Sequence, residues 1–246
     1  MLGKSKVRFL EIKGLPLPVP VLVLLLLLAA GGFLWSSLVR ADHAQREELL
    51  RQTRVVSQAL NIDSLRALSG TEADLGTPNY LRLKEQLASV RFVLPQCRFI
   101  YLMGRLPDKT VFFFVDDQPV GSVDEAPAGM LYHDVPDDFQ RVFDTGMSCT
   151  AGPFRDRWGS FVSGAVPVID PATGACLAVL ALDMDASRWN WRVAAQTAWP
   201  VGLVLLLLFV LAAALAASGA QPSSRIRHPI RHAAWLVLAA GLILTA

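Results

Sequence analysis

The sequence has little charge and none of the motifs that mark the common enzyme and nucleic-acid-binding classes. Charged residues make up 18% of its 246 residues, and 23 basic against 21 acidic side chains leave a formal net charge of +2. No basic stripe is interleaved with aromatic residues, so we expect no nucleic-acid partner. No phosphate-binding glycine-rich loop occurs, and Ser160 and Ser163 lack the Gly-x-Ser-x-Gly elbow of many hydrolases. We therefore expect no enzymatic activity within this chain.

Cysteine is also scarce, with only Cys97, Cys149 and Cys176. No Cys-x-x-Cys pair or nearby histidine cluster gives metal-ligand spacing, so we expect no metal and no cofactor. A small buried apolar residue is the simplest interpretation of each cysteine. In an oxidising compartment one disulfide would leave one thiol over. If a disulfide forms, we expect Cys97 with Cys176, because both begin predicted strands that could be neighbours.

Two long segments contain no charged residue at all, Val19–Val39 and Ala194–Ala217. About 20 apolar residues in a helix are enough to cross ~30 Å of hydrocarbon, so both segments are long enough to span a membrane. Trp189, Trp191 and Trp199 precede or enter the second segment, and tryptophan favours the headgroup layer. A cleaved signal peptide is the alternative for the first segment, but the apolar part of such peptides is only about 7–15 residues long.

Basic residues flank the two apolar segments on their outer sides. They are Lys4, Lys6, Arg8 and Lys13 before the first segment, and Arg225, Arg227 and Arg231 after the second. The positive-inside rule places both flanks in the cytoplasm and the intervening residues outside it. A third apolar stretch, 233–246, is too short to cross a membrane unaided, so we expect the chain to stop inside a third span, either as a fragment or for another reason.

The sequence thus predicts alternating membrane and aqueous segments. They are a cytoplasmic N-terminus at 1–16, transmembrane helix 1 at 17–39, an extracytoplasmic domain at 40–193, transmembrane helix 2 at 194–217, a basic cytoplasmic loop at 218–232, and the start of a truncated transmembrane helix 3 at 233–246. Roughly 150 residues between the spans are enough for one compact domain with its own core.

The first third of the middle segment has helical patterns. The first span continues without glycine or proline through residues 40–60. Asn61-Ile62-Asp63 supplies capping chemistry for a short helix at Ser64–Leu68, which Gly70 can end. Thr77 and Pro78 suit the N-cap and first position of a third helix. Its apolar residues recur every three or four positions and predict one packed face, made of Tyr80, Leu83, Leu87, Val90 and Leu94.

The remainder has strand patterns on either side of an irregular region. β-Branched and aromatic runs predict strands at 98–103, 111–115, 160–169 and 175–185. Proline and glycine between 119 and 136 predict loops, followed by a short helix at 138–143. This order of helices, hairpin, loops, hairpin and exit helix predicts an α+β domain with helices packed on an antiparallel sheet.

Several separated segments resemble one known family. They are Cys97–Arg105, Val111–Asp116, Gly152–Gly159, and Leu182–Ala186 followed by Trp189. Together they closely resemble the extracytoplasmic PAS-like sensor domains of bacterial transmembrane signalling proteins, the PDC or Cache type, over roughly residues 60–190. The resemblance implies a five-stranded antiparallel sheet with a long N-terminal helix, and a cytoplasmic output that is commonly a histidine kinase or a diguanylate cyclase.

Two positions depart from the pattern of this family. Asp108-Lys109 replaces a frequent Asp-Gly turn, so Lys109 would adopt an unfavourable left-handed conformation if the same turn is kept. Ala181 replaces the glycine that usually precedes the terminal Asp-x-Asp. The amino-acid-binding motif of some Cache sensors is not recognisable, so the resemblance does not identify the ligand.

Asp156-Arg157-Trp158 is the first candidate for ligand binding, because a PAS-like domain would place it at the rim of its pocket. An arginine can hold a carboxylate with two hydrogen bonds, and an aromatic ring can form a pocket wall. The alternative is a surface Asp156–Arg157 pair with Trp158 in the core. Strand alternation could turn Tyr101, Arg105 and Ser163 toward the same cavity, although a tyrosine on a sheet face more often serves packing.

The carboxylates of Asp183 and Asp185 alternate on the last strand. Neither acid–base catalysis nor hard-metal binding is indicated, because no facing partner or oxygen-rich cluster is evident. Asp185 is better interpreted as the N-cap of the following helix, and Asp183 as a group that binds ligand or backbone amides. With Trp189, Asp185 would form the exit through which a signal leaves the domain.

The leading functional hypothesis is the ligand-sensing input module of a membrane signalling receptor in a bacterial inner membrane, with its sensor domain in the periplasm. Its expected partners are an unknown small-molecule ligand, the lipid bilayer and a second copy of the chain, the last from the resemblance. The alternatives are a membrane-anchored extracytoplasmic hydrolase, which would need a nucleophile with a base, and a protein-binding assembly module, which would need a large exposed apolar patch.

Overall fold

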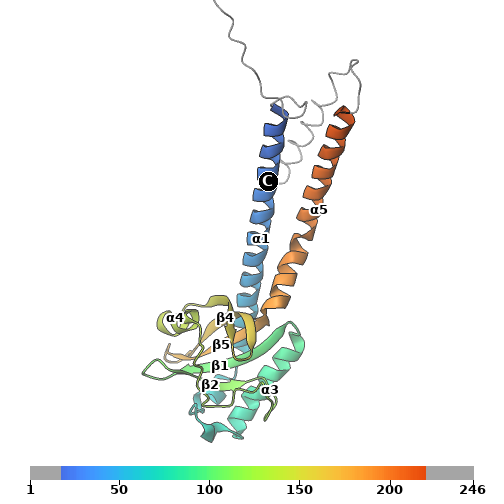
Figure 1. Cartoon of the computed structure of the whole chain (residues 1–246). Coiled ribbons are helices and arrows are strands. Elements are labelled where there is room, and N and C mark those ends of the chain that lie inside the picture. The colour runs from blue at the N-terminus through green and yellow to red at the C-terminus, as the bar shows by residue number, and fades with distance from the viewer. Residues whose placement is uncertain (1–17, 220–246) are drawn as a thin grey trace, which may run out of the picture. The chain divides into compact units, whose positions relative to one another are not determined.

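The computed structural model describes residues 18–219, which form two compact units (Figure 1). One unit is the domain at residues 39–195, and the other contains the segments on either side of it. Helix α1, Pro18–Ala59, and helix α5, Ala186–Gly219, each contribute residues to both units. The predicted segments at 1–16, most of 218–232 and 233–246 lie outside the described residues.

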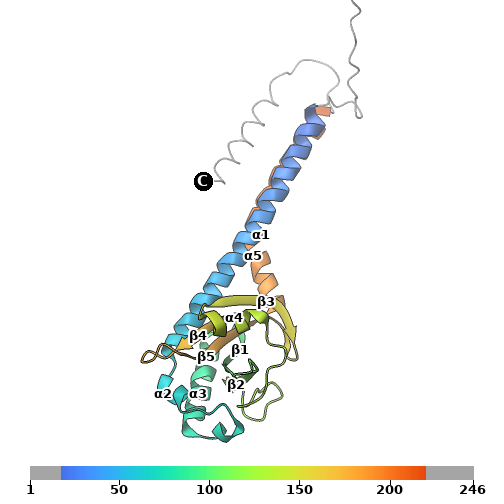
Figure 2. The same cartoon turned by 90° about the vertical axis from the view of Figure 1, so that its left-hand side faces the viewer.

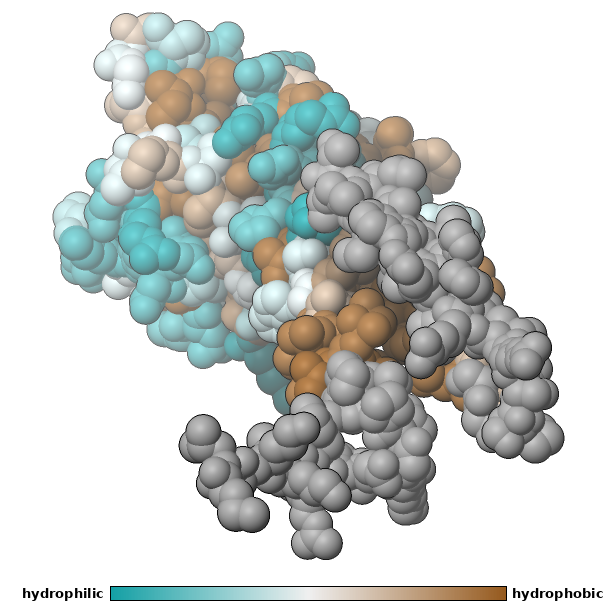
Figure 3. Space-filling model, turned by 90° about the horizontal axis from the view of Figure 1, so that it is seen from above, coloured by the Kyte–Doolittle hydropathy of each residue, from teal (hydrophilic) through white to brown (hydrophobic). Residues whose placement is uncertain are grey.

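Helices α1 and α5 are the two described helices that are long and apolar enough to cross a membrane. In their most apolar windows only 6% of residues are buried. In the space-filling view, the hydrophobic colour gathers on the visible parts of these helices, whereas the domain surface is mostly hydrophilic (Figure 3). Length and composition therefore fit the two predicted spans.

Three shorter helices and one 3-10 turn belong to the domain. They are α2 at Ile62–Arg66, the 3-10 turn at Glu72–Asp74, α3 at Pro78–Val93 and α4 at Asp137–Thr145. The predicted caps are present, because Asn61 accepts a hydrogen bond from the Ser64 amide at 2.9 Å and Thr77 accepts one from the Tyr80 amide at 3.3 Å. Helix α2 begins and ends two residues earlier than predicted.

Five strands form one antiparallel sheet in the order β2-β1-β5-β4-β3. They are β1 at Cys97–Arg105, β2 at Val111–Asp116, β3 at Cys149–Asp156, β4 at Gly159–Ile169 and β5 at Cys176–Asp185. Strand β5 is central, between β1 and β4, and leads directly into α5. The expected α+β class, with a five-stranded antiparallel sheet and a long N-terminal helix, is confirmed.

The two faces of the sheet carry different layers (Figure 2). One face packs against α1, α2 and α3 through alternate strand residues such as Ile100, Val162 and Leu180. Helix α1 approaches β4 closely at Gly164, where an added Cβ would lie 2.8 Å from Thr53 Oγ1. The opposite face, with Phe99, Tyr101 and other residues of the alternate set, packs against α4 and the long β2–α4 connection. We call this opposite face the pocket face.

The strand pattern of the sequence does not reveal β3. This strand contains Gly152 and Pro153, and only one of its eight residues, Ala151, is buried. It forms an edge of the sheet beside β4, where a proline that cannot donate to the ladder is tolerated. A register shift between Ala151 and Phe154 accommodates the two residues.

All three cysteines are free, so the pairing of Cys97 with Cys176, expected only if a disulfide forms, is not made. Strands β1 and β5 are neighbours as expected, but they are antiparallel, so their first residues lie at opposite ends of the pair. Cys97 is opposite Met184, near the end of β5. The expectation for the β1–β2 turn is correct, because Lys109 adopts a left-handed φ of 71°.

Candidate ligand site

A cavity lies between the pocket face of the sheet and the β2–α4 connection. Its lining combines rings and carboxylates, and consists of Phe99, Tyr101, Phe113, Asp116, Asp124, Ala126, Tyr132, Asp156, Trp158 and Asp183. The cavity volume is about 20 Å³, enough for one water-sized group. No lysine, arginine or histidine belongs to this lining.

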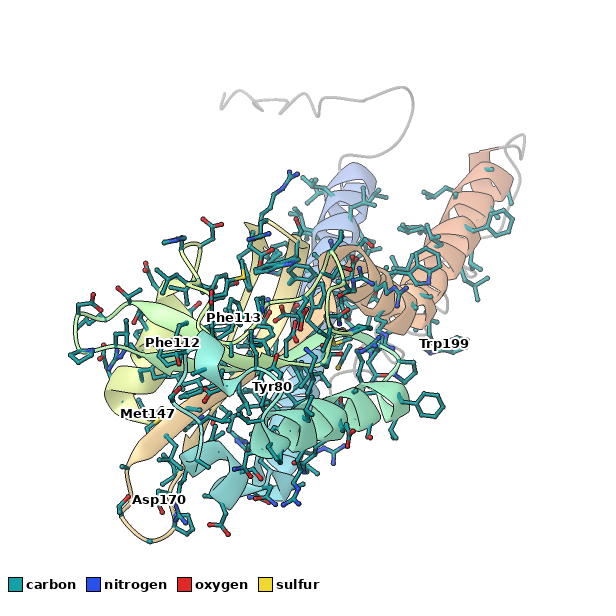
Figure 4. The ribbon with its side chains drawn as sticks, turned by 90° about the horizontal axis from the view of Figure 1, so that it is seen from below. Tyr80, Phe112, Phe113, Met147, Asp170 and Trp199 are labelled. Atoms are coloured by element: carbon teal, nitrogen blue, oxygen red, sulfur yellow. The ribbon has the colours of Figure 1, made fainter. Side chains whose placement is uncertain are left out.

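The aromatic part of the lining surrounds Phe113 of β2, which is labelled in Figure 4. Its ring centroid lies 5.3 Å from that of Tyr101, 5.0 Å from that of Tyr132 and 5.7 Å from that of Trp158. Edge-to-face packing of this kind fixes ring orientation. Negative ring faces also attract cations at such sites.

Asp183 is the most deeply buried carboxyl group of the lining, with 2% of its surface exposed. The Tyr101 hydroxyl donates a hydrogen bond to its Oδ1 at 3.2 Å. Burial raises the pKa of Asp183 to about 7, while the hydroxyls of Ser163 and Tyr101 oppose this rise and the Asp156 carboxylate adds to it. Ser163 is opposite Asp183 in the β4–β5 register and is fully buried. A carboxyl group with this pKa changes charge near neutral pH.

Asp156 is held at the end of β3 by neutral donors. The Tyr132 hydroxyl donates to Oδ2 at 3.0 Å, and the Trp158 and Gly159 amides donate to Oδ1 at 2.8 and 3.1 Å. Asp156 and Arg157 form no ion pair among the described residues, since the Arg157 guanidinium lies over the Trp158 ring, but Trp158 does pack against the core cluster as that alternative expected. The hydrogen bonds to Asp156 shape the β3–β4 turn that carries Trp158 into the cavity wall.

A second, more open hollow adjoins the cavity and shares Tyr132 and Trp158 with it. Its volume is about 320 Å³, and it is also lined by Met130, Leu131, His133, Asp134 and Arg157. The guanidinium carbon of the exposed Arg157 lies 4.8 Å from the Trp158 ring centroid. The indole Nε1 of Trp158 is buried and has no hydrogen-bond partner within the described chain. Tyr132 and Trp158 therefore form a partition between the inner cavity and the outer hollow.

Two further carboxylates of the lining pair with basic side chains that do not themselves line the cavity. Asp116 Oδ1 lies 2.6 Å from Lys84 Nζ, and its Oδ2 accepts the Ala126 amide at 2.7 Å. Lys84, a buried residue of α3, also contacts Glu125 at 2.9 Å. Asp124 pairs with Arg98 at 2.6 Å. These pairs hold the first part of the β2–α4 connection against α3 and β1.

Among the predicted binding residues, Tyr101, Asp156, Trp158 and Asp183 line the inner cavity and Arg157 lines the outer hollow, whereas Ser163 and Arg105 belong to neither lining. The NH1 of Arg105 pairs with Asp144 at 2.7 Å, and its guanidinium stacks on Phe143, so it packs against α4. The expectation that Arg105 faces the cavity is wrong. Strand alternation correctly places it on the pocket face, but four residues of extended chain separate it from Tyr101 by about 13 Å along the strand.

Sequence reasoning missed the contributions of the β2–α4 connection and of β2. Tyr132, Asp124 and Ala126 come from the segment that lacks any periodic pattern, and Phe113 was assigned only to a strand. One signal was available, since Tyr132 is one of only three tyrosines in the sequence. Among residues 18–219, no group of three or more metal-binding side chains is assembled.

At the other end of β5, two contacts connect the strand to α5 and α1. Asp185 accepts hydrogen bonds from the Ser187 and Arg188 amides at 2.9 and 3.3 Å, which caps α5 as the sequence predicts. Trp189 Nε1 donates to Asp42 Oδ1 at 2.8 Å, and Arg46 binds the other oxygen at 2.7 Å. We call the Asp42, Arg46 and Trp189 contacts the clasp, because they join α1 to α5.

Comparison with known proteins gives matches among solved structures only. No family model matches the chain, and no curated protein matches it. The ligand-binding domain of the Campylobacter jejuni chemoreceptor Tlp3, in complex with L-valine, is 16% identical, with a TM-score of 0.46, and the match covers 66% of this chain and 61% of that one. The sensor domain of the Vibrio cholerae histidine kinase DctB is 16% identical, with a TM-score of 0.49, and the match covers 65% of this chain and 57% of that one.

The chain thus spans about three fifths of the length of the chemoreceptor domains that it matches. These structural neighbours are sensory domains of chemoreceptors and histidine kinases.

Proposed function

We propose that this chain is the input module of a bacterial membrane signalling receptor and that its ligand carries a small organic ammonium group. The observation that carries the proposal is the lining of the inner cavity, which combines five aromatic rings and four carboxylates without any basic side chain. Aromatic faces and carboxylates both attract cations, and their attraction strengthens where water is excluded.

Asp183 and Asp156 are the carboxylates best placed to bind the ammonium group. Asp116 and Asp124 already pair with Lys84 and Arg98, whereas the hydrogen bonds to Asp183 and Asp156 come from hydroxyl and amide groups. Because the inner cavity holds only about one water-sized group, the body of the ligand would occupy the outer hollow. Entry then requires Tyr132 and Trp158 to separate. Arg157 in the outer hollow could bind an acidic group on the same ligand.

The signal would leave through the central strand. Asp183 lies on β5, two residues before Asp185, which caps α5. Trp189, four residues after Asp185, contacts α1 through the clasp. A ligand that binds one arrangement of β5 and α1 more tightly would shift the population toward that arrangement. In this proposal the chain binds and does not catalyse, and the output belongs to another part of the receptor.

The proposal includes the topology inferred from the sequence. Spans at 17–39 and 194–217 would cross the bacterial inner membrane, with the domain at 40–193 in the periplasm and both basic flanks in the cytoplasm. The part of α1 beyond the membrane, residues 40–60, would contact a second copy of the chain in a homodimer.

The ligand proposal is tested by isothermal titration calorimetry of the full chain in lipid nanodiscs. A panel of small amines is compared with the N-acetylated form of each amine, which keeps the body and loses the charge. We expect binding of at least one amine, no binding of its acetylated form, and at least a tenfold loss of affinity on Asp183→Asn.

Asp144→Asn provides the matched control, because Asp144 is an exposed carboxylate that pairs with Arg105 outside the cavity. This variant should bind as tightly as the parent chain. Equal binding of an amine and its acetylated form, or no loss of affinity on Asp183→Asn, would contradict the proposal.

A further inference from the structure

Helix α3 ends in two strongly exposed apolar residues. Phe92 and Val93 expose 88% and 74% of their surface, although Tyr80, Leu83 and Leu87 of the same helix are buried. A single exposed apolar residue is ordinary on a protein surface. The significance of this pair depends on what lies beside it.

The end of α3 lies beside the first two turns of α5. Cys97, which follows α3 closely in the chain, is opposite Met184, two residues before α5 begins. Val193 of α5 packs against the same core cluster as Val90 and Leu94. Burial raises the pKa of the Cys97 thiol to about 12, and the nearby Arg192 guanidinium opposes that rise.

These first turns of α5 add aromatic and basic side chains to the same edge of the domain. Trp191 exposes 76% of its surface, and Arg188 and Arg192 are also exposed. We call this set the α3–α5 edge: Phe92, Val93, Arg188, Trp191 and Arg192. It combines side chains that insert into the boundary between headgroups and hydrocarbon with side chains that pair with lipid phosphates.

We propose that the α3–α5 edge docks on the outer surface of the bilayer, with Phe92 and Val93 inserted among the headgroups. The proposal rests on the membrane topology given above. Val193, which packs against the core cluster that Val90 and Leu94 also contact, directly precedes the proposed span at 194–217. A lipid surface at the start of that span would therefore meet both the end of α3 and Trp191. Lipid is the occupant that matches aromatic and basic residues placed next to a span.

Docking would hold the C-terminal end of α3 at a constant position relative to the membrane surface. Helix α3 also carries Lys84, which holds Asp116 in the wall of the inner cavity. If ligand binding rearranges the cavity wall, the wall would then move relative to α3, whose C-terminal end is held by lipid.

The proposal is tested by nitroxide labelling of the full chain in vesicles of phosphatidylethanolamine and phosphatidylglycerol. Cys149 and Cys176 are replaced by serine to limit labelling, and Cys97 stays because it is buried. Single labels are introduced by Phe92→Cys, by Val123→Cys and by Leu205→Cys. Val123 exposes 83% of its surface on the β2–α4 connection and is the matched aqueous control, whereas Leu205 exposes 61% in the middle of the proposed span.

Collision with oxygen, which partitions into lipid, is compared with collision with a water-soluble nickel chelate. We expect the labels at 92 and 205 to favour oxygen and the label at 123 to favour nickel. A label at 205 that favours nickel would overturn the topology itself. A label at 205 in lipid with a label at 92 as accessible to nickel as that at 123 would overturn only the docking proposal.

A label at 92 that neither reagent reaches would also overturn the proposal, because it would indicate a protein cover such as a second copy of the chain. Circular dichroism checks the fold of each variant. Val93→Cys repeats the measurement if Phe92→Cys does not fold.

Discussion

At the scale of single residues, Asp183 couples the cavity to pH. A carboxyl group buried among Tyr101, Ser163 and aromatic rings keeps its proton up to a pH of about 7. An ammonium ligand would favour the ionised form, so binding would release this proton near neutral pH. Perturbed titration of this kind inside a cavity is typical of functional sites.

The raised pKa of Asp183 predicts how stability depends on pH. In the unfolded chain Asp183 ionises near the ordinary value of 3.8, whereas in the folded protein it retains its proton to about 7. The folded state therefore binds more protons in this window, and its free energy of unfolding falls as pH rises, by up to about 1.4 kcal/mol per pH unit.

Chemical denaturation of the parent chain and of Asp183→Asn at intervals between pH 4 and 8 measures this contribution, taken as the difference between the two. We expect the parent to lose stability relative to the variant as pH rises to about 7, and the difference to stay constant above that pH. A difference that is independent of pH from 4 to 7 would contradict the assignment.

At the scale of elements, buried ion pairs connect α3 to the cavity wall. Lys84 is 7% exposed and holds both Asp116 and Glu125, so removal of its charge leaves two carboxylates buried without a cation. Uncompensated buried charges of this kind cost about 3–5 kcal/mol. Loss of an exposed ion pair costs far less, about 0–1 kcal/mol.

We expect Lys84→Met to destabilise the domain by about 3 kcal/mol or more. Arg51→Met is the matched comparison, because Arg51 and Glu48 form an exposed pair on α1, and it should destabilise the domain far less than Lys84→Met. Urea denaturation of both variants checks the difference. Equal effects of the two substitutions would show that Lys84 does not hold the β2–α4 connection.

At the scale of the whole molecule, α1 enters the domain, α5 leaves it, and the clasp joins the two. Trp189 is buried and its indole donates to Asp42, whereas Trp191 is exposed and makes no described hydrogen bond. Trp189→Phe removes the donor and keeps an aromatic ring. The proposed signal route therefore predicts that this variant binds ligand but transmits the ligand signal to the membrane helices poorly.

Transmission is measurable as a ligand-dependent change in the distance between spin labels at Leu38 and Val201, determined by pulsed electron paramagnetic resonance. We expect the change to shrink at least twofold in Trp189→Phe and to persist in the control Trp191→Phe, with ligand affinity unaltered in both. If the ligand-dependent change in distance is as large in Trp189→Phe as in the parent chain, the clasp does not take part in signal transmission.

Local patterns were enough to predict most elements but only part of the site. Thr77 and Pro78 mark the start of α3 because capping depends on neighbouring residues alone. Asp156 and Trp158, which the family resemblance placed at the pocket rim, and Asp183 line the cavity, and their role in ligand binding stays a prediction. Arg105 does not line the cavity, because its partner Asp144 belongs to a helix 39 residues later in the chain.

The sequence by itself determined the two long apolar helices, the capped helices and four of the five strands, since each depends on residues that are close in the chain. Only the tertiary structure decided which residues meet. Antiparallel pairing of β1 with β5 separated Cys97 from Cys176, and the aperiodic β2–α4 connection brought Tyr132 and Asp124 into the cavity wall. Packing contacts of this kind join residues that are distant in the chain, so they cannot be predicted from the local periodicity of apolar residues.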